Sequence, residues 1–312
     1  MVKLLIALIF KRVFHWLWWP VKVSGLANVK IGERRLVTRV AILTSRLRTG
    51  ILPNPVEIGG HKFFYGPSSR SSIYDYLGDK YEMETAQMVD KLLQAGDVFV
   101  DVGANIGYFT LRAASRVGIT GKVHAFEPFP ETYEALEKTV LANEYGERTN
   151  VSCTALSDAP GEQKFFLANR GSNFHSLVTT RQDQSFIVVP VTTLDDYFES
   201  IDYAGPVKIV KIDVEGAEIN VLGGMSKTAQ ASPDLSVIFE YHPSFVKETA
   251  CSGGNLFEAL GRLKITKFYV LDSLNEPTEV NPSYQDFDRH VKQYSYVNVL
   301  ARKLPLSFAM PL

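Results

Sequence analysis

The sequence contains little cysteine. Only two cysteines, Cys153 and Cys251, occur among 312 residues, and they form no CxxC pair or other close spacing. Disulfide-stabilised secreted domains and cysteine-based zinc sites need several cysteines at short, regular spacings. The chain is therefore predicted to have neither a disulfide framework nor a cysteine metal site.

The N-terminus lacks a long apolar run. Its first run covers residues 4–10 and ends at Lys11 and Arg12. A helix needs about 20 apolar residues to cross a bilayer, so a simple membrane-spanning helix is not expected. The positive start is typical of a signal peptide, but no small-residue cleavage site follows the run. These features predict a cytoplasmic protein.

Acidic residues are nearly absent from residues 1–50, which carry a formal charge of +9 and leave −10 for the rest of the chain. All three tryptophans, Trp16, Trp18 and Trp19, lie in the same arm. Basic residues beside tryptophans are typical of a helix in the lipid headgroup layer. We therefore expect residues 1–22 to contact the inner face of a membrane peripherally. Docking of this arm on the protein body or on a second subunit is the alternative.

Nucleic acid is not an expected partner, because the basic residues of the arm alternate with bulky aliphatic side chains. The predicted partners are instead a small-molecule, saccharide or lipid-linked compound and, through the arm, a membrane surface.

Apolar strand-like runs alternate with helical patterns over residues 96–303, which predicts an α/β domain with a mostly parallel sheet and helices on both faces. The last two strand-like runs follow each other without an obvious helix, so we expect an antiparallel pair at one edge. Residues 161–190 read as a hairpin inserted into the alternation. Residues 51–95 form a lead-in segment with a helix, and residues 304–312 form a tail.

A glycine turn, GANIG, follows the first strand of this domain. Gly103 and Gly107 allow close approach of a ligand to the backbone, but the central glycine favoured by dinucleotide sites is missing. Asp101, two residues earlier, would repel a phosphate and attract a positively charged amino group. Glu127 follows Gly107 by twenty residues, where an acid can accept hydrogen bonds from ribose hydroxyls.

A ligand with a ribose, a cationic centre and no phosphate fits this pattern, and S-adenosylmethionine is such a ligand. Two other interpretations remain open at this point. Asp101 and Glu127 can simply cap helices at the rim of the sheet. A nicotinamide-dependent oxidoreductase shares the sheet and the ribose-binding acid.

Five segments resemble the FkbM family of S-adenosylmethionine-dependent methyltransferases: VFVDVGANIGYFTL, AFEPFP, ALSD, TLDDYF and VKIDVEGAEINVLGG. The resemblance covers about residues 81–243, and the KIDVEGAE stretch is its most specific part. It implies a class I methyltransferase fold, which is Rossmann-like, with a seven-stranded sheet and an antiparallel last strand. The better-known members of the FkbM family methylate hydroxyl groups on natural products, sugars and lipids.

The resemblance also implies which residues surround the cofactor. The glycine turn would hold the methionine part, Glu127 the ribose, and residues 155–158 the adenine, while Tyr81 and Glu84 would close over the methionyl end. The predicted cofactor contacts are Glu84, Asp101, Gly103, Ala104, Asn105, Gly107, Glu127, Pro128, Ala155, Leu156, Ser157 and Asp158.

A hydroxyl acceptor must lose its proton, which requires a base or a metal near the reacting oxygen. Lys211 and Asp213 share one face of a strand because side chains alternate with period two. We expect Asp213 or His242 to accept the proton, with Lys211 and Glu215 orienting the acceptor or the base.

Competing structural roles exist for the neighbouring acids. Glu218 can lie on the solvent side of a short helix or cap its first turn, and Glu240 can form a structural ion pair with Lys211. A Mg²⁺ or Mn²⁺ site built from acids and His242 is conceivable, but no spacing is diagnostic and no metal is predicted. In the inserted polar stretch, residues 172–176, His175 is a second candidate base on an acceptor-binding flap, or part of a solvated hairpin tip.

The sequence thus predicts an enzyme that methylates a hydroxyl of a saccharide, lipid-linked or natural-product acceptor. The alternatives are the nicotinamide-dependent oxidoreductase and a non-catalytic, membrane-associated scaffold that retained the fold.

Overall fold

The computed structural model describes residues 52–77, 81–168, 175–178, 184–242, 253–272, 276–281 and 283–306. The chain divides into two compact units, Met1–Val56 and Glu57–Leu312, and the second unit is described below. The arm at residues 1–50, with the membrane-interface helix expected at residues 1–22, lies outside the described residues. In the described part of the chain, no helix is both long enough and apolar enough to cross a bilayer.

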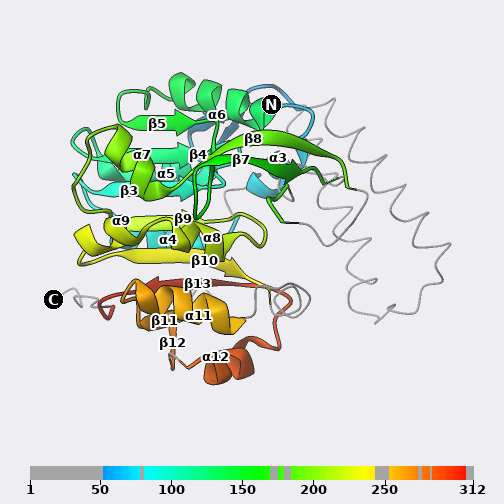
Figure 1. Ribbon diagram of the computed structural model, residues 1–312. Helices are drawn as coiled ribbons and strands as arrows, with labels where there is room; N and C mark the ends of the chain where they lie inside the picture. Colours follow the sequence, from blue (N-terminus) through cyan, green and yellow to red (C-terminus); the bar gives the residue numbers. More distant parts are fainter. Residues whose placement is uncertain are drawn as a thin grey trace. The chain divides into compact units, whose positions relative to one another are not determined.

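An eight-stranded sheet forms the centre of this unit, in the order β12-β11-β13-β10-β9-β3-β4-β5 (Figure 1). Its strands are β3 (Val98–Val102), β4 (Lys122–Phe126), β5 (Thr149–Ser152), β9 (Ile209–Ile212), β10 (Ser236–Tyr241), β11 (Lys267–Leu271), β12 (Thr278–Val280) and β13 (Val297–Arg302). The strands from β10 to β5 run parallel, and β13 lies antiparallel between β10 and β11. The predicted class I methyltransferase fold, with its mostly parallel sheet and antiparallel last strand, is confirmed.

The predicted strand count of seven is wrong, because β12 adds an eighth strand antiparallel to β11. β12 has only three residues and a single buried side chain, Val280, so it leaves no apolar run in the sequence. A helix, α12 (Tyr284–Val291), also stands between β11 and β13, where none was expected. Only Phe287 and Val291 of this helix are buried, so its sequence looks like a polar loop.

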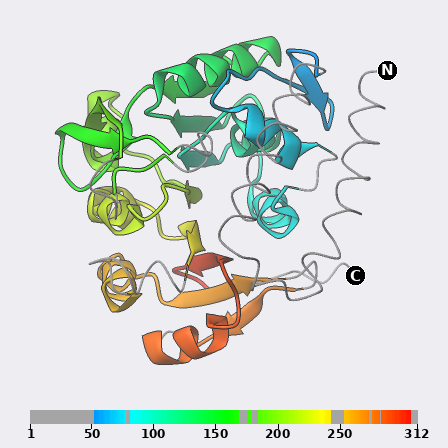
Figure 2. The same cartoon turned by 90° about the vertical axis from the view of Figure 1, so that its right-hand side faces the viewer.

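Helices cover both faces of the sheet. They are α3 (Arg70–Tyr76), α4 (Met83–Leu92), α5 (Tyr108–Val117), α6 (Pro130–Ala142), α7 (Leu194–Ser200), α8 (Glu218–Gly223), α9 (Ser226–Ala231), α11 (Gly253–Arg262) and α12. Figure 2 shows α4 and α5 on one side of the strands and α7, α9 and α11 on the other. From the central β3–β9 pair, the sheet continues through β4 and β5 on one side and through β10 on the other. Right-handed crossovers in these two directions place the connecting helices on opposite faces of the sheet.

Coverage on both faces explains the composition of the central strands. All five residues of β3 are buried, including Asp101, and all four residues of β9 are buried, including Lys211. Strands of this kind read as unbroken apolar runs, not as an alternation. A charged residue inside such a run is therefore conspicuous. The register of β3 and β9 sets Asp101 directly beside Lys211.

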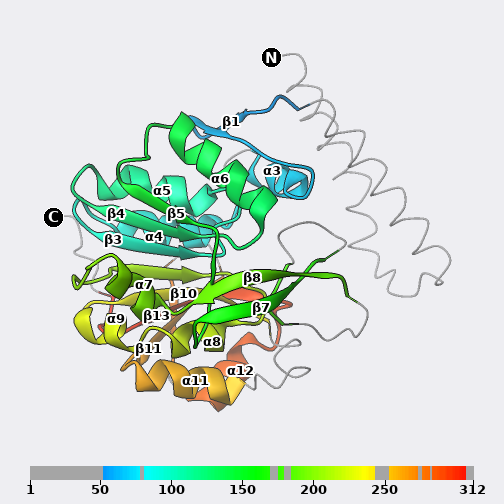
Figure 3. The same ribbon diagram turned by 45° about the horizontal axis from the view of Figure 1, so that its top comes forward.

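A smaller three-stranded sheet follows β5 in the chain. It consists of β6 (Ala155–Leu156), β7 (Gly161–Phe166) and β8 (Phe186–Thr192), with β7 and β8 forming an antiparallel hairpin (Figure 3). Phe165, Val189 and Val191 are buried on one face, whereas Phe186 and Val188 are exposed on the other. A two-stranded sheet, β1 (Val56–Ile58) and β2 (His61–Phe63), precedes α3.

Candidate active site at the carboxyl ends of the parallel strands

The glycine turn directly follows β3. Gly103 and Gly107 have φ values of 81° and 96°, and Asn105 between them has a φ of 50°. The backbone N–H groups of Gly103 and Ala104 both donate to the carbonyl of Phe126, each at 3.0 Å, and so hold the turn against the end of β4. The turn leads into α5, whose first N–H groups point toward this edge of the sheet. The predicted ligand-binding turn therefore lies at the carboxyl ends of β3 and β4.

Glu127 lies where the sequence predicts it, at the end of β4 and against the turn. Its carboxylate accepts the backbone N–H of Asn105 and that of Phe129, each at 3.0 Å. Burial raises the pKa of Glu127 to about 7, although these two hydrogen bonds oppose the rise. Each carboxylate oxygen keeps a lone pair for a further donor, so the group fits a pair of ribose hydroxyls. Glu127 also supports the start of α6, so the capping alternative describes part of its role.

Asp101 is buried in β3 and accepts hydrogen bonds from Thr110 in the first turn of α5, so the capping alternative describes part of its role. The hydroxyl of Thr110 donates to its Oδ2 at 2.6 Å. Burial raises the pKa of Asp101, while the neighbouring Lys211 opposes the rise. Asp101 of β3 and Lys211 of β9 thus belong to one charged cluster.

Lys211 is 4% exposed, and its Nζ donates to Oδ2 of Asp213 at 2.9 Å. The ammonium group also lies 4.5 Å from the ring centroid of Phe109. Burial alone lowers the pKa of Lys211, but Asp213 and the other carboxylates of the cluster more than offset it and the pKa is raised. The structural ion pair with Glu240 considered from the sequence is wrong, because Lys211 pairs with Asp213.

Glu240, at the end of β10, instead pairs with His242 through the Nε2 atom of the imidazole. This hydrogen bond raises the pKa of His242. The imidazole also lies 5.6 Å from the ring of Tyr296, between centroids. His242 and Glu240 are half-buried, so both face a space that a ligand can reach.

Two more acids occupy the loop after β9. Glu215 has a φ of 54° and is half-buried. Burial, followed by the charges of Asp213 and Glu240, raises the pKa of Glu215 to about 8. Glu218 accepts the backbone N–H of Gly216 at 3.0 Å, as expected of a residue that caps a turn. Burial raises the pKa of Glu218 to about 7. The strand-end acids predicted from the sequence are therefore brought together.

The residues predicted at the adenine edge, Ala155, Leu156, Ser157 and Asp158, follow β5 in the chain. Ala155 and Leu156 form β6, and their side chains are buried in hydrophobic clusters. The hydroxyl of Ser157 donates to Asp158, which also accepts Nδ2 of Asn220 at 3.2 Å. These four side chains are engaged with the protein itself.

Cys153 is a nearer candidate for the adenine edge. Its thiol lies 3.8 Å from the carbonyl oxygen of Pro128, and the Glu127 N–H donates to the carbonyl of Ser152 at 3.0 Å. The first residues after β5 thus reach the same edge of the sheet as Pro128, and none of the sequence motifs includes Cys153.

The lead-in segment supplies Glu82, which sequence reasoning also missed. Tyr81 lies against Tyr108, the first residue of α5, with ring centroids 5.4 Å apart. Glu82 interacts with the charges of Lys211 and the neighbouring carboxylates, and its side chain accepts Nδ2 of Asn298 at 3.1 Å. Glu84 lies in the first turn of α4, two residues beyond. The adjacent Tyr81 and Glu82, just before the helix, were the feature of the sequence that could have pointed to Glu82.

The described part of the hairpin tip is residues 175–178, while residues 172–174 lie outside the described part. His175 accepts the Ala168 N–H on Nδ1 at 2.9 Å, and its ring lies edge-on to Phe129 with centroids 4.9 Å apart. Burial lowers the pKa of His175. The hydroxyl of Ser176 lies 2.8 Å from the carbonyl of Glu215, to which it donates. The hairpin therefore reaches the acidic loop through Ser176, and His175 has a packing role.

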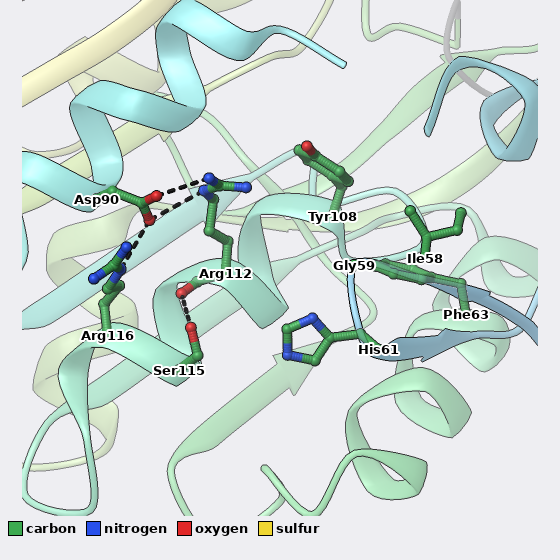
Figure 4. A pocket seen from close by; sticks show the side chains of 9 residues that line it. All are labelled: Ile58, Gly59, His61, Phe63, Asp90, Tyr108, Arg112, Ser115 and Arg116. Atoms are coloured by element: carbon green, nitrogen blue, oxygen red, sulfur yellow. Dashed lines mark hydrogen bonds and ion pairs between the residues drawn. The ribbon is translucent and has the colours of Figure 1, made fainter. Parts of the chain in front are cut away.

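A cavity of about 300 Å³ lies beside α5, and none of the predicted site residues lines it (Figure 4). Asp90 of α4 accepts Nε and Nη2 of Arg112 at 3.1 and 2.7 Å, and Nε of Arg116 at 2.9 Å. These ion pairs join the last part of α4 to the middle and end of α5, whereas the ring contact of Tyr81 with Tyr108 lies at the starts of the two helices.

Among the described residues, no group of three or more histidine, cysteine, aspartate or glutamate side chains is arranged to hold a metal ion.

Residues 101–296 match the family described as the methyltransferase FkbM domain. The hexuronic acid methyltransferase AglP of Haloferax volcanii is 27% identical over 207 residues, which cover 63% of this chain and 80% of that protein. The 31-O-demethyl-FK506 methyltransferase FkbM of Streptomyces tacrolimicus is 30% identical over 162 residues, 43% of this chain and 61% of that protein. A SAM-dependent O-methyltransferase structure from Thermotoga maritima gives a TM-score of 0.41 at 15% identity, covering 81% of this chain and 78% of that one.

The glycine turn gives a first prediction. A Cβ atom on Gly103 would lie 2.0 Å from the carbonyl oxygen of Asp213, whereas one on Gly60, with a nearly equal φ of 82°, meets nothing within 4 Å. Gly60→Ala should lower the free energy of unfolding by about 1–2 kcal/mol through its backbone conformation alone. Gly103→Ala should lower it by a further ~1–3 kcal/mol because of overpacking, and should weaken S-adenosylmethionine binding. Urea unfolding and calorimetry measure both effects, and equal losses for the two variants would contradict the clash.

The ion pairs of Asp90 give a second prediction. Asp90→Asn removes the charge and turns an amide N–H₂ toward two guanidinium groups, so it should lower the free energy of unfolding by about 1.5–3 kcal/mol. Glu258→Gln is the matched control, since Glu258 also pairs with an arginine, Arg262, but on an exposed helix surface. That control should change stability by less than about 0.5 kcal/mol. Urea unfolding at pH 7 compares the two, and similar losses would show that the α4–α5 junction is no stronger than a surface pair.

Proposed function

Because the chain belongs to the FkbM family of methyltransferases, we propose that it methylates a hydroxyl oxygen of a saccharide or lipid-linked acceptor. The protein is an enzyme, and its cofactor is S-adenosylmethionine. Family membership excludes the nicotinamide-dependent oxidoreductase considered from the sequence. The acceptor and the residues that handle it are the proposed part.

The observation that carries the proposal is the Lys211–Asp213 pair beside the glycine turn. Asp213 uses Oδ2 for Lys211, and its Oδ1 makes no hydrogen bond within the described residues. The Asp213 side chain is 27% exposed, so its carboxylate is not closed off by the protein. A carboxylate held in place by a buried ammonium is a suitable proton acceptor for a hydroxyl.

His242 is the weaker of the two bases proposed from the sequence. Hydrogen bonding to Glu240 raises its pKa, and the backbone at Ser295 acts in the same direction. An imidazole whose protonated form is stabilised from two sides is a poor proton acceptor near neutral pH. We therefore assign the proton transfer to Asp213, and the orientation of the acceptor to His242, Glu215 and the Lys211 ammonium.

The cofactor residues follow from the same geometry. The cofactor supplies an electrophilic methyl group when bound. Glu127 would hold the ribose, Cys153 and Pro128 would border the adenine, and the turn from Gly103 to Gly107 would face the methionine part. With the cofactor bound, the acceptor oxygen would take the methyl group from the sulfonium, which would leave as the neutral thioether, and the hydroxyl proton would pass to Asp213. Alignment of these groups is worth about 7–11 kcal/mol in favourable cases.

The acceptor class rests on two kinds of support. One relative acts on a hexuronic acid and another on the demethylated form of FK506, and both are named as methyltransferases. The basic, tryptophan-containing arm supports a membrane-associated acceptor, such as a saccharide on a lipid carrier. Hydroxyl groups abound on such acceptors, which favours oxygen over nitrogen.

Labelled methyl transfer tests this function and its base together. The wild-type protein should transfer tritiated methyl groups from S-adenosylmethionine to saccharides or lipid-linked saccharides extracted from its source organism. Asp213→Asn should lower kcat by about 10²–10⁴-fold, the usual contribution of a general base, while retaining cofactor binding. Asp196→Asn, an exposed acid of α7, is the control and should leave the rate unchanged. Label in no extract would favour the non-catalytic scaffold, and an active Asp213→Asn enzyme would exclude Asp213 as the base.

Vesicle binding tests the membrane part. Lys11→Gln with Arg12→Gln should weaken binding of the full-length protein to anionic vesicles by about tenfold or more, since each basic residue near anionic lipid contributes about 1 kcal/mol. Neutral phosphatidylcholine vesicles should show little difference between the two proteins. Equal binding of both proteins to anionic vesicles would remove the proposed role of the arm.

A further inference from the structure

Glu82 occupies an unusual position for a glutamate. It directly precedes α4 and has φ 39° and ψ 54°, in the left-handed region. A non-glycine residue in this region costs about 1–2 kcal/mol in conformational energy, so the surroundings must hold it there. Such conformations concentrate at functional sites.

The contacts of Glu82 come from distant parts of the chain. Nδ2 of Asn298, on β13, donates to its Oε2 at 3.1 Å. Asn298 is paired across the strands with Glu240 of β10. The side chain is half-buried, so it is enclosed but still within reach of a ligand. The charged and titratable groups that act on Glu82 are Tyr81, Lys211, Asp213 and Glu240, and Tyr76 and Tyr296 are in turn influenced by its charge.

The charges of this cluster do not balance in the protein alone. Glu82, Asp101 and Asp213 all act on one cation, Lys211. Three ionised carboxylates around a single buried ammonium leave two uncompensated negative charges in a poorly solvated space, which is unfavourable. The protein can relieve this excess by holding protons on the carboxylates or by binding a second cation.

S-adenosylmethionine brings such a cation. Its sulfonium and α-ammonium groups outnumber its carboxylate, which gives a net charge of +1. S-adenosylhomocysteine, the product, has lost the sulfonium charge and is neutral overall. The two molecules otherwise share the adenosine, the amino group and the carboxylate.

We propose that Glu82 is a cofactor-binding residue whose carboxylate recognises the positive charge of S-adenosylmethionine, and that cofactor binding releases a proton from the Glu82–Lys211 cluster. The inference rests on the methyltransferase activity but not on the proposed acceptor or base. Tyr81, the residue before Glu82, packs against Tyr108 at the start of α5, with ring centroids 5.4 Å apart, and so holds Glu82 near the helix that follows the glycine turn. Loss of the sulfonium charge then favours release of the product over retention.

The direction of the pH dependence follows from the protonation of the carboxylate. Burial raises the pKa of Glu82 to about 7, with Lys211 opposing and Asp213 adding to the rise. Below this pH the cation must displace a proton, so affinity for S-adenosylmethionine falls by up to about tenfold per pH unit for one proton released. Above it the carboxylate is already ionised, and affinity levels off. The affinity for S-adenosylmethionine divided by that for S-adenosylhomocysteine measures the contribution of the sulfonium charge, because both molecules carry the α-amino group.

Titration calorimetry on the full-length protein provides the test. S-adenosylmethionine and S-adenosylhomocysteine are titrated at pH 7 in buffers of different ionisation enthalpy, which counts the protons released. Wild-type protein should release more protons with S-adenosylmethionine than with S-adenosylhomocysteine, by up to one. Glu82→Gln should remove most of this difference and weaken S-adenosylmethionine binding by about 10–100-fold, with a smaller loss for S-adenosylhomocysteine.

The substituted amide oxygen can still accept the hydrogen bond from Asn298, so this variant removes the charge and keeps the structural contact. Glu258→Gln, on the exposed surface of α11, is the control and should behave as wild type. Equal proton release and equal affinity for Glu82→Gln and wild type would overturn the inference. A wild-type affinity ratio that stays constant from pH 6 to pH 8 would also overturn it, without depending on any variant. Absence of S-adenosylmethionine binding to the wild type would instead contradict the methyltransferase assignment.

Discussion

The buried ammonium of Lys211 is the charge on which the site depends. A single cation inside a covered sheet is unfavourable unless carboxylates surround it, and β3, the loop after β9 and the segment before α4 each supply one. Phe109 covers another side of the ammonium with its ring face. The carboxylates are in turn acceptable in the interior because of the lysine. Loss of the Lys211 ammonium would leave these carboxylates without their cation.

The fold brings these groups together through its strand order. β9 lies beside β3 although more than a hundred residues separate them in the chain, and this pairing sets Lys211 against Asp101. β13 enters the sheet antiparallel, so its first residues, not its last, reach the carboxyl ends of the parallel strands. Asn298 arrives at Glu82 for this reason. The reversal of one strand therefore allows the C-terminal part of the chain to contribute to a site otherwise built from strand ends.

The sequence predicted the parts of the site that lie on regular elements. Asp101 and Lys211 stand out because each interrupts an apolar run, and the distance from the glycine turn to Glu127 corresponds to one helix and one strand. Glu82 could not be found in this way, because its role depends on a left-handed turn before α4 that no periodicity reveals. Ala155 to Asp158 were assigned by motif, whereas the packing of β6 against β8 turns two of these side chains into the core. β12 and α12 were missed because each buries only one or two side chains.

The hydrogen bond between Asn298 and Glu82 spans 216 residues. During synthesis on a ribosome, the N-terminal partner leaves the exit tunnel long before the strand that completes its surroundings. The half of the domain that carries the glycine turn is therefore made without the group that holds Glu82. The surroundings of Glu82 are therefore complete only when β13 has inserted between β10 and β11.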